Sequence, residues 1–362
     1  MSSTNDQQTN NSNHQCCVAV HVGAGYHSQQ KASSYKAAMK QACIAAMDKL
    51  RQGGHANDAV ECAVRVLEDD PVTNSGIGSN LNRVGLVECD AAIMSSEPDA
   101  FGAVGAVSAA NAILKCYSGG PDCHLGLVPP MLLVGEGADA WAHARGIETN
   151  NNTRHKITEA ALGKYEEYMN RITNVPKAAE TEADLFDNGG GSQDLLMDTV
   201  GAVCVDSHGN VAAGVSSGGI ALKYPGRVGE AAMFGCGCWA ETQLDDDDCP
   251  LAVGCSVTGT GEQIMREMLA KNCAQRSGDL FTVLSDSFEE FNKAKSLSKY
   301  RYRSAGVVLL RHDVESNTSE MGIAHTTHSM GYGYMTQDMS SPKAKISRKP
   351  DSAPTTVTAI RL

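Results

Sequence analysis

The 362-residue sequence lacks the features that mark several common protein classes. It has no long basic run and a formal net charge of −12, which argues against a nucleic-acid-binding face. Residues 1–15 are rich in Ser, Asn and Gln and contain no apolar stretch, so they predict neither a signal peptide nor a membrane anchor. We expect a disordered tail here, and no direct contact with nucleic acid or membrane.

Motifs for phosphate and zinc binding are incomplete. The glycine-rich segment 21–25 follows an apolar run but has neither the G-x-G-x-x-G spacing nor a Walker lysine. Two further cysteines follow Cys236 and Cys238, but the C-x₂₋₄-C spacing and a matching His pair are missing, so we predict no metal site. Without a secretory signal, the thirteen cysteines are expected to be reduced and buried.

The composition and the apolar spacing predict one globular domain. Apolar residues make up 42% of the chain and charged residues 20%, as in ordinary globular proteins. The length is compatible with a single domain that has a large core. Apolar periodicity predicts helices at residues 31–50, from 57, 159–172, 263–272 and 280–292, and strands at 17–22, 200–205, 211–215, 305–310 and 321–326. These blocks favour a layered α+β sandwich.

A predicted hairpin stands at the centre of the chain. The apolar runs 200–205 and 211–215 are separated by residues 206–210, in which Asp-Ser-His-Gly has the composition of a tight turn. An antiparallel hairpin returns Ser217 to the same end of the sheet as Thr199. A lone Thr at this place is usually only a good strand residue, but two paired hydroxyls favour a catalytic interpretation.

A threonine hydroxyl is a weak nucleophile and needs a base within hydrogen-bond reach. No His–Asp pair lies near Thr199 in the sequence, and His208 belongs to the far end of the hairpin. Cleavage of the Asp198–Thr199 bond would free the α-amine of Thr199, whose reference pKa of about 7.7–8 suits a base near neutral pH. We therefore hypothesise that the chain cuts itself before Thr199.

These motifs resemble the type-2 asparaginase group of N-terminal-nucleophile (Ntn) hydrolases. The resemblance runs from about residue 18 to about residue 350 and is carried by Asp-Thr-Val-Gly-Ala-Val, Ser-Ser-Gly-Gly and Gly-Arg-Val-Gly. Within that group, residues 223–229 and 234–241 resemble the threonine aspartase branch. The resemblance implies the four-layer αββα Ntn fold and no cofactor.

The resemblance also implies how the chain is divided. We expect one domain over residues 16–350 and a C-terminal tail over 351–362. The cut before Thr199 would give an α subunit (1–198, flexible from about 150) and a β subunit (199–362). We expect the two to stay together as an αβ heterodimer and to assemble as a dimer of heterodimers.

Several residues match motif positions of the family. The resemblance implies that Ser217 orients the nucleophile, that Thr258 and Gly259 form the oxyanion site, and that Asn74 supports the active site. Gly23 lies at the expected edge of the site. Lys31, near the same glycine-rich loop, is expected to add a second positive charge for an acidic substrate.

Arg227 is expected to bind the substrate carboxylate, because a guanidinium presents a planar fork and no other fixed positive charge stands in its motif. In asparaginases an Asp shortly after this Arg holds the free α-amine of the substrate. Here Glu230 takes that position, and its greater length disfavours a small amino-acid substrate.

The resemblance therefore implies a threonine endopeptidase that cleaves protein substrates after Asp. The implied substrates are trithorax-type regulators and general transcription factor IIA, with localisation in nucleus and cytoplasm, although the basic import run of the branch is missing. The first alternative is an L-asparaginase or isoaspartyl peptidase acting on small substrates. A lysosomal glycosylasparaginase would need a signal peptide. The second alternative is a non-catalytic binder of acidic peptides.

Overall fold

The computed structural model describes residues 14–118, 128–148, 153–174, 199–245 and 248–362. Its strands are β1 (Cys17–Gly25), β2 (Asp90–Ser96), β3 (Asp99–Val104), β4 (Val200–Val205), β5 (Val211–Ser217), β6 (Cys238–Leu244), β7 (Pro250–Gly259), β8 (Ala305–Asp313), β9 (Thr318–His325), β10 (Ser329–Thr336), β11 (Lys343–Arg348) and β12 (Thr356–Arg361). Its α-helices are α1 (Ala32–Arg51), α2 (Ala56–Asp69), α3 (Val107–Lys115), α5 (Gly135–His143), α6 (Glu159–Asn174), α8 (Gly261–Glu267), α9 (Leu269–Ala274) and α10 (Leu280–Lys293).

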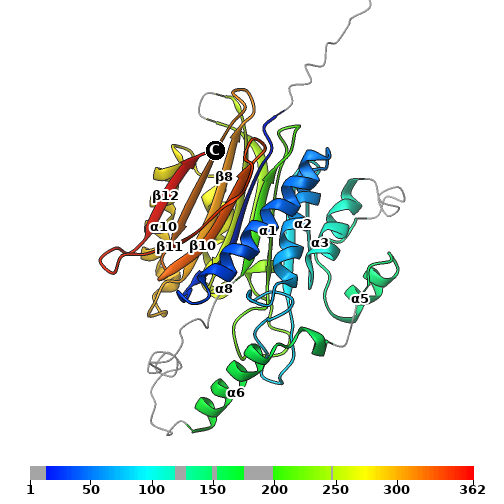
Figure 1. Cartoon of the computed structure of the whole chain (residues 1–362), viewed down its shortest axis with the longest axis vertical. Helices are drawn as coiled ribbons and strands as arrows, with labels where there is room; N and C mark the ends of the chain where they lie inside the picture. Colours follow the sequence, from blue (N-terminus) through cyan, green and yellow to red (C-terminus); the bar gives the residue numbers. More distant parts are fainter. Residues whose placement is uncertain (1–13, 119–127, 149–152, 175–198, 246–247) are drawn as a thin grey trace, which may run out of the picture.

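The strands form two antiparallel sheets. One has the order β11-β10-β1-β4-β5-β2-β3, and the other has the order β12-β9-β8-β7-β6. Helices α1, α2 and α3 pack on the first sheet, and α9 and α10 pack on the second (Figure 1). Strands β4 and β5 of the first sheet contact β6 and β7 of the second, so the two sheets face each other. The predicted αββα sandwich is thus present.

The alternation of side chains along β4 explains why this strand is buried on both faces. Val200, Ala202 and Cys204 belong to the core under α1 and α2. Val203 and Val205 belong to the core between the sheets. Successive residues of a strand point to opposite faces. Thr199 therefore continues the series that points between the two sheets.

The C-terminal part of the chain corrects two predictions. Residues 351–362 are not a tail throughout, because β12 pairs with β9 along its length. Strands β10 and β11 were not predicted from the sequence, although β10 lies beside β1 in the first sheet. The predicted helix 263–272 is two short helices, α8 and α9, which Met268 separates with a left-handed φ of 43°.

The start of α2 is another correction. The sequence predicts this helix from residue 57, but α2 begins at Ala56, after His55. The N–H of Ala56 donates to Oδ2 of Asp206 at 3.1 Å, so the capping carboxylate comes from the distant β4–β5 turn. At the N-terminus, the described part of the expected tail is ordered, since buried His14 contacts His312.

The described cysteines carry free thiols, and most of them are buried. Burial raises the pKa of Cys17 and of Cys238 to about 12, so both thiols stay protonated at neutral pH. Among the helices that the structure describes, none is long and apolar enough to span a membrane.

Candidate active site

The two predicted hydroxyls meet at the open end of the β4–β5 hairpin. Val200 pairs with Ser216 in the register of these strands, so Thr199 and Ser217 come next on each side. Oγ1 of Thr199 lies 3.0 Å from Oγ of Ser217, and both residues are buried. Oγ of Ser217 also accepts a 3.0 Å hydrogen bond from the N–H of Gly219, which fixes the serine side chain. The geometry suits an orienting group beside a nucleophile.

Glu230 is the second partner of the Thr199 hydroxyl. Its Oε1 lies 3.0 Å from Oγ1 of Thr199, and its side chain is buried. A hydroxyl has one proton, so Thr199 donates either to Ser217 or to Glu230. Burial raises the pKa of Glu230 to about 7, and the nearby Asp90 acts in the same direction, while Arg227 opposes them. The carboxyl group therefore changes its charge near neutral pH.

A buried histidine of β1, His21, pairs with Gly201, two residues after Thr199, and sequence reasoning gave it no role. Nε2 of His21 is 2.8 Å from Oγ of Ser256, which donates to the carbonyl of Gly214. Burial lowers the pKa of His21 to about 3, so the imidazole is neutral. A Cβ on Gly201 would come within 2.4 Å of Nε2 of His21, so glycine is required two residues after Thr199. In the sequence, the glycine of Thr-Val-Gly is the residue that indicates this close packing against His21.

The guanidinium of Arg227 lies against three glycines. A Cβ would approach its nitrogens to 3.0 Å at Gly219, 2.8 Å at Gly229 and 2.7 Å at Gly261. Nε donates to Oε1 of Glu262 at 3.0 Å. Nη2 is 2.9 Å from the same oxygen, but the angles do not make a hydrogen bond, which leaves Nη2 a buried donor without an acceptor. Such a donor is suited to an incoming carboxylate.

Arg227 is not the only positive charge here, which corrects the sequence prediction. Lys223 is buried, and its Nζ donates to the carbonyl of Glu88 at 2.6 Å. Burial lowers the pKa of Lys223, although the nearby Asp90 favours its charged form. Lys31, which was expected to supply this second charge, is the residue before α1 and does not line the pocket around Thr199.

Asn74 connects its own loop to the end of β5. Its carbonyl accepts from the N–H of Gly218 at 2.8 Å, and its Nδ2 donates to the carbonyl of Gly219 at 2.9 Å. Its Oδ1 accepts from the N–H of Asn80 at 2.8 Å, so both ends of the amide are held. Asn74 also lines the pocket beside Thr199 and Ser217. This placement fits a supporting role, which stays a prediction.

The expected oxyanion segment lies at the junction of β7 and α8. Gly259 lines the pocket and has a φ of 140°, a conformation that favours glycine. Oγ1 of Thr258 accepts from the N–H of Ala24 at 3.2 Å, so this side chain reaches β1. Gly23 precedes Ala24 at an irregularity of β1 and does not line the pocket. The role of the Thr258–Gly259 backbone stays a prediction.

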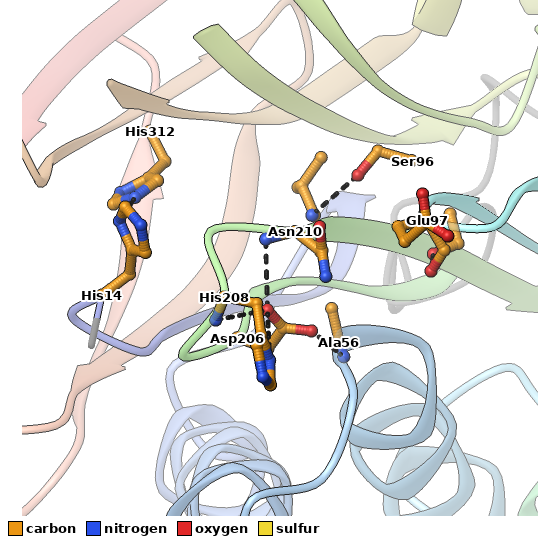
Figure 2. Close-up of polar contacts among 10 residues, drawn as sticks. His14, Ala56, Ser96, Glu97, Asp206, His208, Asn210 and His312 are labelled. Atoms are coloured by element: carbon orange, nitrogen blue, oxygen red, sulfur yellow. Dashed lines mark hydrogen bonds and ion pairs between the residues drawn. The ribbon is translucent and has the colours of Figure 1, made fainter. Parts of the chain in front are cut away.

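The other end of the hairpin carries the polar residues of the turn. Figure 2 shows Asp206 between the backbone amides of Ala56, His208 and Asn210. His208 belongs to this turn, so it lies at the end of the hairpin away from Thr199, as the sequence predicts.

Asp198, the expected residue before the cut, and residues 175–197 of the predicted flexible segment lie outside the described residues.

Comparison with known proteins identifies the family. A model of the type-2 asparaginase family, described as asparaginase, matches residues 14–343. The chain belongs to this family. An isoaspartyl peptidase/L-asparaginase of Xenopus laevis is 36% identical over 255 residues, which cover 70% of this chain and 73% of that protein. A plant-type L-asparaginase of Pyrococcus horikoshii is 31% identical over 338 residues, with 91% and 99% covered.

An isoaspartyl peptidase of Escherichia coli is also similar, with 34% identity over 265 residues that cover 71% of this chain and 75% of that protein. Family membership makes the chain a hydrolase of the Ntn asparaginase superfamily. The expected family and fold class are thus confirmed. The names of these relatives do not include the threonine aspartase branch, so that finer resemblance stays a hypothesis.

Proposed function

We propose that the chain is a self-activating threonine endopeptidase that cleaves protein substrates after Asp. The observation that carries this proposal is the position of Arg227, which lines both the small pocket at Thr199 and a cavity of about 700 Å³ beside it. A cavity of this size accommodates far more than one amino acid. Nη2 of Arg227 is buried and ion-paired with Glu262 without a well-aligned hydrogen bond, so it can still donate to a substrate carboxylate at the junction.

The orientation of Glu230 also supports a peptide substrate. In asparaginases, the resemblance implies, the acidic residue after the Arg holds a free α-amine. Here Oε1 of Glu230 lies 3.0 Å from the Thr199 hydroxyl, and Oε2 lies where a side chain on Gly261 would be. The carboxyl group is thus engaged with the nucleophile. A residue inside a peptide chain has no free α-amine that would need such a partner.

The proposed reaction has two stages. In the first, Oγ1 of Thr199 attacks the carbonyl carbon of Asp198, and its proton passes to the departing nitrogen. Breaking the C–N bond frees the α-amine of Thr199 and leaves an ester on Oγ1, which water hydrolyses to release Asp198 and restore the hydroxyl. In the second, that amine accepts the proton of Oγ1 while the hydroxyl attacks the substrate carbonyl. The leaving amine takes the proton, and water hydrolyses the acyl-enzyme. Ser217, 3.0 Å from Oγ1, orients the hydroxyl in both stages.

The second candidate is an L-asparaginase or isoaspartyl peptidase that acts on small substrates. The comparisons favour this candidate over the endopeptidase, because the relatives named above are called isoaspartyl peptidases and L-asparaginases. The same Thr199 chemistry would serve both activities. They differ in what must be bound beside Arg227: a free α-amine in one case and a continuing peptide chain in the other.

The cellular context is also a proposal. The resemblance to the threonine aspartase branch supports nuclear transcription regulators as substrates, with trithorax-type proteins and general transcription factor IIA as the first to test. It further supports a nuclear and cytoplasmic enzyme and an αβ heterodimer that assembles into a dimer of heterodimers. No cofactor enters the proposed chemistry.

One substrate set separates the candidates. Processed protein is incubated with a decapeptide containing an internal Asp–Gly bond, with its Asn–Gly counterpart, with an isoaspartyl dipeptide and with free Asn, and the products are identified by mass. The endopeptidase predicts cleavage of the Asp–Gly decapeptide alone. Cleavage of free Asn or of the dipeptide alone supports the second candidate. Binding of the decapeptide without cleavage of any substrate would support the alternative that the chain is a non-catalytic binder of acidic peptides.

A further inference from the structure

The β4–β5 turn brings together three side chains of the kinds that bind transition metals. Within the described ranges of the chain, His55, Asp206 and His208 form one group whose ligand atoms all lie within 4.8 Å of one another. His55 immediately precedes α2, and the other two belong to the turn. This group lies at the hairpin end away from Thr199, so it plays no part in the proposed catalysis.

Asp206 is a rigid member of this group. Its side chain is buried, with Oδ1 accepting from the N–H groups of His208 at 2.9 Å and Asn210 at 3.1 Å (Figure 2). Oδ2 accepts one bond, from the N–H of Ala56 at 3.1 Å. A carboxylate oxygen has two lone pairs, so Oδ2 keeps one for a further partner. The fold therefore fixes a carboxylate that keeps acceptor capacity and has one oxygen within 4.8 Å of a ring nitrogen of each histidine.

The histidines are the adaptable members. Both are exposed, and their rings stack at an interplanar angle of 28° with centroids 6.2 Å apart. Nδ1 of His208 lies 3.8 Å from Oδ1 of Asp206. Around a tetrahedral zinc ion, ligand atoms at bond lengths of about 2.0–2.2 Å stand roughly 3.4 Å apart. The ligand atoms lie within 4.8 Å of one another, and rotation of the two exposed rings can supply the remaining approach of at most about 1.4 Å.

A neighbouring histidine pair does not compete for this role. His14 and His312 are buried, and Nδ1 of His14 lies 3.1 Å from Nε2 of His312 (Figure 2). Nδ1 of His312 lies 2.9 Å from Oγ of Ser319, so both ring nitrogens of His312 are engaged inside the protein. The cap on α2 and the turn hydrogen bonds account for Asp206, but they do not account for two exposed imidazoles gathered at the same carboxylate.

We propose that His55, Asp206 and His208 form a binding site for a divalent transition-metal ion of the zinc class. Two imidazoles and one carboxylate suit Zn²⁺, Co²⁺ or Ni²⁺, with water in the fourth position. The ion would link the start of α2 to the β4–β5 turn. Because it would bind the folded chain alone, it would raise the thermal stability without changing the hydrolytic site.

The test is titration of the full-length, untagged, metal-free protein with Zn²⁺, followed by calorimetry and by thermal unfolding. His55→Ala and His208→Ala are the test variants, and His143→Ala, at the exposed end of α5, is the matched control. The wild type and the control should bind one Zn²⁺ and gain several degrees in Tm. Each test variant should bind at least tenfold more weakly while its self-cleavage and circular dichroism stay unchanged.

Cobalt provides a second readout, since Co²⁺ reports its ligands by absorption. The site predicts visible d–d bands without the near-ultraviolet thiolate band that a cysteine ligand would produce. A thiolate band, an absence of saturable Zn²⁺ binding by the wild type, or wild-type Zn²⁺ affinity in both histidine variants would overturn the proposal.

Discussion

The two ends of the β4–β5 hairpin differ in the hydrogen-bond partners of their buried polar groups. At the turn, the carboxylate of Asp206 accepts three hydrogen bonds from backbone amides, two of them from its own turn. At the open end, Thr199, Ser217, Glu230 and Arg227 come together from three segments of the chain. At the turn, the carboxylate is held by these backbone amides. The open end holds a hydroxyl shared between two acceptors and a buried arginine nitrogen that is ion-paired with Glu262 but makes no well-aligned hydrogen bond.

The difference separates the end of the hairpin that stabilises the fold from the end that carries the proposed chemistry. A satisfied buried carboxylate stabilises a fold, whereas an unsatisfied donor and a carboxyl group with a strongly raised pKa are typical of functional sites. Substitutions at the open end should therefore change activity more than stability. Substitutions at the turn should do the reverse, and the expected effects below are ordered from the largest.

Thr199→Ala should abolish both self-cleavage and hydrolysis, because the residue supplies the attacking oxygen and, after the cut, the base. The variant should remain a folded full-length chain, visible as one band on a denaturing gel. Thr199→Ser keeps a hydroxyl and should still cut itself, more slowly. Normal fragments from Thr199→Ala would remove the basis of the assignment.

Ser217→Ala should lower kcat by a factor on the order of 10² or more, because a group that orients the nucleophile acts mainly in the transition state. The change in KM should be small. Steady-state kinetics on processed protein measure both constants. Ser216→Ala is the neighbouring control, since that hydroxyl donates to Glu68 of α2 at 2.6 Å and Ser216 does not line the pocket around Thr199. Wild-type turnover by Ser217→Ala would contradict the orienting role.

Arg227→Lys should lower kcat/KM by about 10- to 150-fold, although the positive charge is kept. Loss of one charge-assisted hydrogen bond costs about 1.5–3 kcal/mol, and Lys cannot present the planar fork. The substrate is tested as an Asp peptide and its Asn counterpart. If Arg227 binds the carboxylate, the preference for Asp should shrink in the variant. An unchanged preference would assign the recognition to another group, with Lys223 the first to examine.

Glu230→Gln should alter the pH dependence of substrate binding. The pKa of about 7 means that Glu230 is neutral below that pH and negative above it. The negative form would repel a substrate carboxylate at Arg227, so wild-type KM should rise roughly three- to tenfold as pH increases through 7. Glu230→Gln should keep the low KM at every pH. A rise of equal size in the variant would mean that another group is responsible.

Asp206→Ala should have the smallest effect on activity and a clear effect on stability. It leaves three N–H groups at the turn and at the start of α2 without their acceptor, which costs about 2–4 kcal/mol. Urea unfolding of the processed protein measures this loss, and kcat/KM of the folded fraction should stay within twofold of wild type. A large loss of turnover without a loss of stability would contradict the assignment of a structural role to the turn.

The sequence predicts the hairpin and its two hydroxyls because both depend on local pattern: alternation, a tight turn between residues 205 and 211, and the return register. It does not predict groups that only tertiary packing brings together, such as Lys223 at Arg227 or Asp206 at Ala56. Strand β10, with two glycines, has a weak strand pattern. The edge strand β11 is half charged, which protects an edge but hides the strand from apolar periodicity.

The central claim is that the chain becomes an enzyme by cutting itself before Thr199. Intact mass and N-terminal sequencing of freshly purified wild-type protein test it most directly, with Thr199→Ala as the reference that cannot cut. The account predicts two fragments, residues 1–198 and 199–362, with Thr199 as the new N-terminal residue and hydrolytic activity that grows as they form. A full-length chain that hydrolyses its substrate without any cut, or a cut at another bond, would contradict it.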